Sequence, residues 1–235
     1  LFGYSGVYPK LDGGQAEYVR VPNASRSLLA LPDSVSSEDA LFLADILPTG
    51  YAGVDNAGVG EGDLLVVQGA GPVGLMAVIV GLSRGAKVVA VDGVEARRRL
   101  AEDLGATSVA PQDAGELIER LSDGAGADVV VEASGSIPAL KEALRLARAQ
   151  GVISVIGAHF ENDFPLDNGT MFEKELTLKF SIGNPFETRA MLLDAIERGV
   201  LAPRAVLTHV LPMEQAEEAY AKFDGREFTK VALTY

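Results

Sequence analysis

Three glycines stand where a strand is expected to give way to a helix. Gly69, Gly71 and Gly74 follow the apolar run 64–68 with the spacing GxGxxG and precede a second apolar run. In such a turn the first glycine permits a tight bend, the second lets the backbone approach a pyrophosphate, and the third lets helix and strand pack closely. The helix N-terminus adds unpaired N–H groups and partial positive charge, so the motif predicts dinucleotide binding through the backbone. The alternative is that the glycines serve close packing alone.

An acidic residue ends the next apolar run. Asp92 follows the predicted strand 87–91. A carboxylate in this place accepts hydrogen bonds from the adenosine ribose hydroxyls of NAD and repels the 2′-phosphate of NADP. The expected cofactor is therefore NAD. Arg97, a little further along, either lies over the adenine or is simply solvated.

The elements that would position these residues alternate regularly. Apolar runs at 64–68, 87–91, 128–132 and 152–156 are separated by helical patterns, which is typical of βαβ units. The sequence therefore predicts an α/β protein of the Rossmann type, with a doubly wound parallel sheet.

Helix ends and further strands follow from local signals. Ser36, three residues before Asp39, predicts a capped helix start. A helix beginning near Pro138 is expected to close at Gly151, and further helices are expected at 96–104, 116–121, 187–198 and 213–223. Strands are also expected at 15–21, 176–182 and in the closing KVALTY.

Composition limits the class of partner. The chain of 235 residues is 48% hydrophobic and carries a formal charge of −13, which opposes binding to nucleic acid and to anionic membranes. No apolar run is long enough to cross a bilayer and no secretory leader is recognisable, so the expected location is cytoplasmic. The complete absence of cysteine excludes disulfides and thiolate metal ligands from this chain.

Segments along the whole chain resemble one enzyme family. They are DGGQAEYVRVP, LADILPTGY, AGVGEGD, GAGPVG, GADVVVEASG, GVISVIG and THVLPMEQAEEAYAKF. In their order and spacing they resemble the zinc-dependent medium-chain alcohol dehydrogenases, especially the formaldehyde dehydrogenase-like and threonine dehydrogenase-like members. This resemblance is more specific than GxGxxG alone.

The resemblance implies a Rossmann domain inserted in a GroES-like, β-rich catalytic domain. Residues 46–183 would form the NAD-binding domain, while 1–45 and 184–235 would belong to the catalytic domain. The N-terminal part of that catalytic domain, which in the family carries a cysteine and a histidine as zinc ligands, has no counterpart in this sequence.

Site residues are carried over from the family one by one. Asp45 matches a zinc-ligand position, although one carboxylate makes no catalytic zinc site, and its alternative role is to cap or solvate a turn. Thr49 resembles a threonine beside the nicotinamide, and Val73 resembles the residue behind that ring. Ser134, Gly157 and Ala158 follow later strands, where they could contact the ribose and the carboxamide.

The two histidines are assigned different expectations. His159 follows the strand ending at Ile156, where it could approach the nicotinamide, serve as a replacement metal ligand or base, or simply hydrogen-bond a loop. His209 lies in the returning catalytic-domain portion, where a structural hydrogen bond is expected.

Two functions remain open at this point. The first is an NAD-dependent oxidoreductase of the zinc alcohol dehydrogenase type, which moves a hydride between an alcohol or hydrated aldehyde and NAD. The alternative is a non-catalytic NAD-binding protein derived from that family. In either case the strand at 176–182 resembles an edge strand that pairs across a two-fold axis, so a homodimer or homotetramer is expected.

Overall fold

The structure, a computed structural model, describes residues 11–162 and 166–235. Its α-helices are α1 (Ala24–Ser27), α2 (Ser37–Ala40), α3 (Ile46–Asp55), α4 (Pro72–Ser83), α5 (Glu95–Asp103), α6 (Ala114–Leu121), α7 (Ile137–Leu146), α8 (Asn168–Glu173), α9 (Pro185–Glu197) and α10 (Ala216–Asp224). Short 3-10 turns at Leu41–Ala44, Pro111–Asp113, Pro203–Val206 and Met213–Gln215 join some of them. The strands are β1 (Leu64–Gln68), β2 (Lys87–Val91), β3 (Thr107–Val109), β4 (Ala127–Glu132), β5 (Ala147–Val155), β6 (Thr177–Phe180), β7 (His209–Pro212) and β8 (Val231–Thr234).

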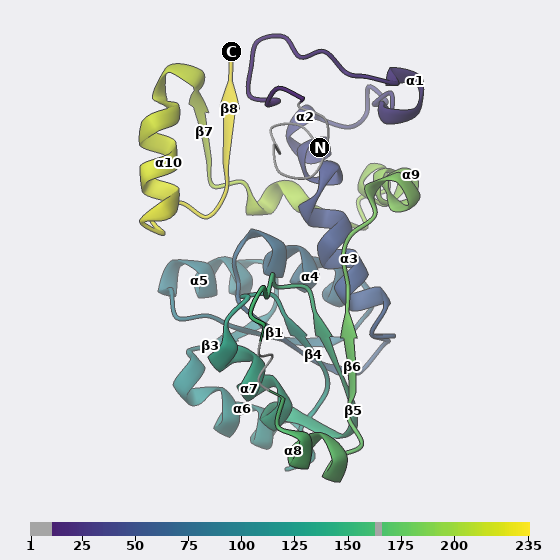
Figure 1. The fold of residues 1–235 in the computed structure, drawn as a ribbon, viewed down its shortest axis with the longest axis vertical. Helices are drawn as coiled ribbons and strands as arrows, with labels where there is room; N and C mark the ends of the chain where they lie inside the picture. Colours follow the sequence, from purple (N-terminus) through teal and green to yellow (C-terminus); the bar gives the residue numbers. More distant parts are fainter. Residues whose placement is uncertain (1–10, 163–165) are drawn as a thin grey trace.

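Six strands form one parallel sheet in the order β3-β2-β1-β4-β5-β6 (Figure 1). This is the doubly wound order in which the chain reverses direction across the sheet between β1 and β4. Gln68 at the end of β1 stands beside Val91 of β2 and Glu132 of β4. The predicted Rossmann architecture is confirmed, and the carboxyl ends of three strands meet beside the glycine turn.

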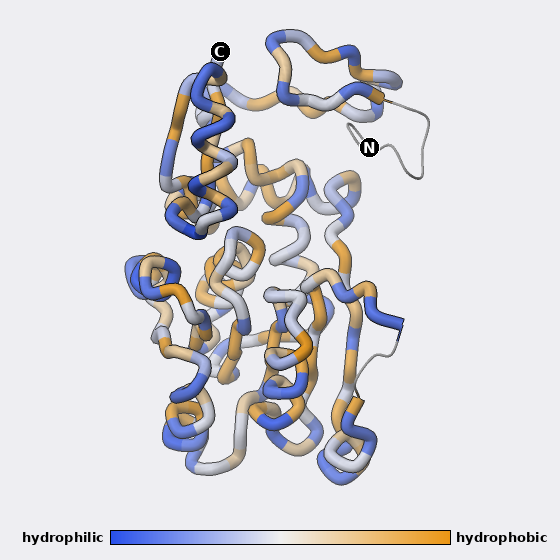
Figure 2. Tube along the Cα trace, turned by 60° about the vertical axis from the view of Figure 1, so that its left-hand side comes forward, coloured by the Kyte–Doolittle hydropathy of each residue, from blue (hydrophilic) through white to orange (hydrophobic). Residues whose placement is uncertain are grey.

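Helices cover both faces of this sheet. One buried cluster joins α3, α4 and α5 to the sheet, and a second joins α6 and α7 to the opposite face. Figure 2 shows the result as hydrophobic strands at the centre and hydrophilic residues on many of the outer helical turns. β1 is buried along its whole length, which explains why residues 64–67 are apolar without alternation.

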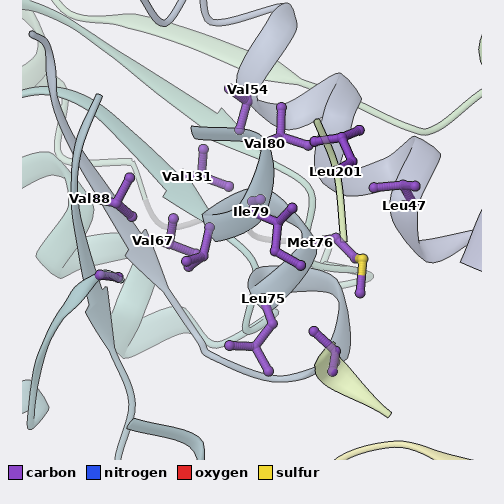
Figure 3. Packing of buried hydrophobic residues seen from close by; sticks show 14 of the residues in the cluster. Leu47, Val54, Val67, Leu75, Met76, Ile79, Val80, Val88, Val131 and Leu201 are labelled. Atoms are coloured by element: carbon purple, nitrogen blue, oxygen red, sulfur yellow. The ribbon is translucent and has the colours of Figure 1, made fainter. Parts of the chain in front are cut away.

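The helix after the glycine turn is packed on two sides. α4 lies between the sheet and α3, so Leu75, Met76 and Val78 have no exposed surface. Figure 3 shows Leu75 and Met76 among the other buried side chains of this cluster. A Cβ on Gly50 of α3 would lie 2.6 Å from the Cβ of Met76, so the two helices approach as closely as only glycine allows. This packing fixes the position of the α4 N-terminus.

The smaller upper part of the molecule contains the chain's C-terminal end. β7 and β8 pair in parallel, and α10 joins them (Figure 1). Among residues 11–162 and 166–235, no helix combines the length and the apolar character needed to span a bilayer.

Two predictions of secondary structure are wrong. The segment 15–21 forms no strand, and Tyr18 in it is 86% exposed. Since a strand is stabilised by the ladder it forms, β-favouring residues do not suffice where no neighbouring strand among the described residues pairs with them.

The helix from Pro138 also ends earlier than expected. It stops at Leu146, and β5 begins at Ala147 rather than after Gly151. The Lys174 ammonium donates to the carbonyls of Leu144, Arg145 and Ala147, and so satisfies acceptors that a longer helix would have used. The apolar spacing through Ala147 could not show this, because Lys174 is distant in sequence.

Candidate nucleotide-binding cleft

The three glycines of the turn meet different surroundings. Gly69 has φ +94° and Gly71 is the N-cap residue of α4. A Cβ on Gly74 would lie 1.7 Å from the Gly69 carbonyl oxygen, whereas a Cβ on Gly71 would have no atom nearer than 3.9 Å. Gly74 is therefore required for packing. At Gly71 the absence of a side chain instead leaves the backbone of the turn accessible to a bound molecule.

Asp92 links the turn to the end of β2. Its carboxylate is largely buried and accepts hydrogen bonds from the backbone N–H groups of Ala70 and Val94, both at 2.8 Å. Each carboxylate oxygen keeps a further lone pair for another donor. The residue predicted to bind ribose hydroxyls is thus fixed beside the glycine turn.

Arg97 is not the solvated residue that was one alternative. Its side chain is 17% exposed, and Nη1 lies 3.8 Å from an Asp92 carboxylate oxygen. Nη1 is also the atom nearest to a Cβ placed on Gly71. The guanidinium therefore lies above the turn, where it adds the positive charge that backbone N–H groups alone supply only in part.

These residues line one cleft of about 670 Å³. The lining comprises Gln68, Gly69, Gly71, Val91, Asp92, Gly93, Arg97, Pro111, Gln112, Ala133, Ser134, Ser136, Pro138, Ala139, Glu142 and Arg226. It is built from the segments after β1, β2, β3 and β4, the first turns of α7, and one residue that follows α10. A crevice outside the carboxyl ends of strands, where their order reverses, is where open α/β sheets bind ligands.

The other predicted cofactor residues are distributed around this cleft. Ser134 lines it, whereas Gly157 and Ala158 pack against Gly135 just beside it. Val73 is half-buried in the first turn of α4 and does not belong to the lining. Ser134 thus lies in the cleft, whereas Val73, Gly157 and Ala158 lie outside its lining.

Asp45 and Thr49 lie apart from the cleft lining, on the first turn of α3. Asp45 is exposed, and its side chain forms no cap hydrogen bond with the helix. Thr49 donates its hydroxyl to the Asp45 carbonyl at 3.0 Å. Burial lowers the pKa of Lys230, and the nearby Asp45 carboxylate partly opposes that change. A lysine is therefore the charged neighbour of the proposed metal ligand.

A zinc ion does not fit the residues that the structure describes. The chain has no cysteine and two histidines. The Nε2 of His159 is hydrogen-bonded to the carboxylate of Glu132. The ring of His209 stacks on Phe228 with ring centroids 3.5 Å apart, so the structural hydrogen bond expected for its side chain is replaced by a ring contact. No group of three potential ligands that could hold a metal ion occurs within residues 11–162 and 166–235. Asp45 alone cannot supply the three protein ligands of a catalytic site.

Several lining residues were not predicted from the sequence. Pro111 and Gln112 follow β3, a three-residue strand without a strong apolar run, although the rule that ligands lie at strand ends would have indicated them. Arg226 is distant in sequence from every other lining residue, and no sequence signal indicates it.

Known proteins are similar to this chain in sequence and in fold. A family model described as zinc-binding dehydrogenase matches residues 72–198, which is just over half of the chain. This chain belongs to the zinc-binding dehydrogenase family. Zinc-type alcohol dehydrogenase B of Aspergillus flavus is 33% identical over 94% of this chain and 54% of its own length. A relative in Mycobacterium tuberculosis, named as a probable zinc-binding alcohol dehydrogenase, is 34% identical over 96% and 58%.

Solved structures of zinc-binding dehydrogenases and other alcohol dehydrogenases superpose on the chain. An alcohol dehydrogenase from Thermus sp. ATN1 has a TM-score of 0.93 at 34% identity and covers 100% of this chain, which spans 68% of that protein. A structure from Sinorhizobium meliloti, described as a putative zinc-binding dehydrogenase bound to NADP, has a TM-score of 0.85 at 26% identity, with coverages of 96% and 67%. The chain thus spans little more than half of the two curated relatives, so the activity of a whole family member is a proposal here.

Proposed function

We propose that the chain binds NAD and serves an oxidoreductase of the zinc alcohol dehydrogenase type, with an alcohol or hydrated aldehyde as the small-molecule substrate. The observation that carries the proposal is that the turn at Gly71 has no side chain over its backbone and lies beside the carboxylate of Asp92, which is held in place by hydrogen bonds. Membership of the zinc-binding dehydrogenase family supports it further.

Different residues of the cleft would bind different parts of the dinucleotide. The N–H groups of the turn and the α4 N-terminus would bind the pyrophosphate, and Asp92 would accept from the adenosine ribose. Arg97 would neutralise part of the phosphate charge. Ser134 and the backbone at Gly157 and Ala158 would orient the second half of the cofactor. When bound, NAD supplies the carbon that accepts a hydride.

The residues that the structure describes do not form a zinc site. Asp45 and Thr49 stay proposals for the reacting end: Asp45 as one metal ligand and Thr49 as a neighbour of the nicotinamide. The domain boundaries at residues 45/46 and 183/184, and a cytoplasmic location, likewise stay predictions.

Calorimetric titration with NAD and with NADP tests the proposal. We expect NAD to bind at least about tenfold more tightly, since a 2′-phosphate would meet the Asp92 carboxylate. Asp92→Asn keeps one acceptor oxygen and removes the negative charge. It should therefore weaken NAD binding and reduce the difference in affinity between NAD and NADP. Zinc content measured on the same sample is expected to be well below stoichiometric.

Asp128→Asn is the matched control, because it removes one negative charge at the opposite ends of the strands. It should leave both nucleotide affinities unchanged. Equal binding of NAD and NADP by the unsubstituted chain would refute the assigned role of Asp92. Absence of binding by either nucleotide would refute the proposed function of this chain.

We also propose that the chain forms a homodimer or homotetramer through β6, which is the last strand of its sheet. Phe180 of this strand and Ile182 just after it are 63% and 89% exposed. Apolar side chains along a sheet edge favour pairing with a second edge.

A further inference from the structure

A fully buried carboxylate joins the loops after β4 and β5. Glu132 ends β4 and has no exposed surface. One of its oxygens accepts from the backbone N–H groups of Ser134 and Gly135, at 2.8 and 3.0 Å, and from the Ser134 hydroxyl. A buried charge is tolerated only where such hydrogen bonds replace water. The Glu132 carboxylate therefore fixes the turn that places Ser134 in the cleft.

The other oxygen of Glu132 binds a histidine from the neighbouring loop. Nε2 of His159 lies 2.9 Å from Oε2 of Glu132, and the His159 side chain is 2% exposed. Its Nδ1 lies 3.6 Å from a carboxylate oxygen of Glu161. Because an ionised carboxylate only accepts, Nε2 is the donor in this pair. The ring is enclosed between two carboxylates and presents almost no surface to the cleft.

The two loops are packed too closely to move independently. A Cβ on Gly157 would lie 2.5 Å from Oε2 of Glu132 and 2.3 Å from the Gly135 nitrogen. A Cβ on Gly135 would lie 2.8 Å from the Ala158 carbonyl oxygen. Approaches this close require glycine at both 135 and 157, so the loop that carries His159 lies directly against the turn that Glu132 holds.

This position belongs to the second half of the fold. In the doubly wound order, one nucleotide of a dinucleotide lies over β1, β2 and β3 and the other over β4, β5 and β6. The turn and Asp92 serve the first half. We propose that His159 is a positioning residue for the nicotinamide half of NAD, acting through Glu132 on the loops after β4 and β5; this inference rests on the proposed function. Its burial makes it unsuited to acid–base chemistry on a substrate.

Comparing the binding of AMP with that of NAD distinguishes this positioning role from a general effect on folding. AMP occupies only the adenosine half, whereas NAD requires both halves. His159→Leu removes the N–H donor with little change in bulk, and should weaken NAD binding about tenfold while AMP binding stays within about twofold. His159→Gln restores a donor at similar reach and should recover most of the NAD affinity.

Further variants make the comparison sharper. His209→Leu, the same substitution at the chain's other histidine, should leave the ratio of NAD to AMP affinity unchanged. If His159→Leu does not fold, Glu132→Gln gives the second test: it removes one of the acceptor oxygens and should also weaken NAD selectively.

The outcomes are distinguishable. Equal weakening of NAD and AMP in the His159 variants, or unchanged NAD affinity, would overturn the positioning role and leave the proposed function intact. Failure of the unsubstituted chain to bind NAD, with or without AMP binding, would overturn the proposed function and the inference together. Selective loss of NAD affinity with rescue by His159→Gln would support both.

Discussion

Gly71 and Gly74 belong to one motif but lack a side chain for different physical reasons. Gly74 leaves no room for a methyl group against the Gly69 carbonyl, whereas the position of a Cβ on Gly71 is almost empty. The first constraint is internal packing, and the second concerns a molecule that is bound from outside. Stability and binding should therefore respond separately to substitution at these two residues.

The paired alanine variants test this difference. Gly74→Ala should lower the free energy of unfolding by about 3 kcal/mol, because the Cβ must displace the backbone of the turn. Gly71→Ala should change it by less than about 0.5 kcal/mol while weakening NAD binding at least about tenfold. Urea unfolding and calorimetry on both variants measure the two effects. Equal losses of stability would contradict the assignment.

At the scale of single residues, the sequence predicted local structure well where the spacing of the residues itself determines that structure. The glycine turn and Asp92 were found because a strand, a tight turn and the end of the next strand are consecutive signals. Glu132 and His159 were not recognised as a pair, since their contact depends on the parallel pairing of β4 with β5. Arg226 reaches the cleft only through tertiary structure.

At the scale of elements, Asp128 ties together the N-terminal ends of three strands. It accepts from the Leu64 backbone N–H at 2.8 Å and from Nε of Arg148 at 2.6 Å. Burial acts to raise the pKa of Asp128, but these hydrogen bonds prevail and hold it below its ordinary value of 3.8. The folded protein therefore favours the ionised carboxylate.

This direction fixes the pH dependence of stability. Because the pKa of Asp128 is lower in the folded than in the unfolded chain, its contribution is present above the unfolded pKa of about 4 and is lost as the pH falls through the folded value. Asp128→Asn should lower the free energy of unfolding by about 1 kcal/mol near pH 7, since the Asp128 side chain is 31% exposed and its charge is partly screened by solvent. Urea unfolding of both proteins near pH 7 and near pH 3 measures it. A cost that did not shrink in acid would show that the charge is not the cause.

Elements were predicted well where their sequences are strongly apolar. β1 and β2 have the bounds expected from the sequence, and the Ser36 hydroxyl caps α2 by accepting from the Asp39 N–H at 3.1 Å. β3 is short and partly exposed, so no apolar run revealed it. The failure at 15–21 has the opposite cause, since residues that favour strands were present without a paired neighbour.

At the scale of the whole molecule, the edge of the large sheet is the surface most suited to association. Ile182→Lys places a charge at a position that is 89% exposed, just after β6. If two copies pair along this edge, the substitution should shift the dimer toward monomer at micromolar concentration, because a buried unpaired charge opposes association.

Sedimentation equilibrium of the two proteins measures the shift. Phe172→Lys is the matched control, because Phe172 is 86% exposed on α8, outside the edge strand. It should leave the assembly unchanged. A monomeric unsubstituted chain, or equal effects of the two lysines, would contradict association through β6.

Arg226 has a consequence for the architecture as a whole. It belongs to the segment between α10 and β8, yet it lines a cleft that is otherwise formed by the large sheet and its helices. A nucleotide that fills the cleft would therefore contact both the residues at the ends of the large sheet and Arg226, which precedes β8 of the two-stranded sheet. By mass action, the free energy of binding would then oppose every opening that separates the two. The cofactor would then serve as a structural component of the molecule as well as a reactant.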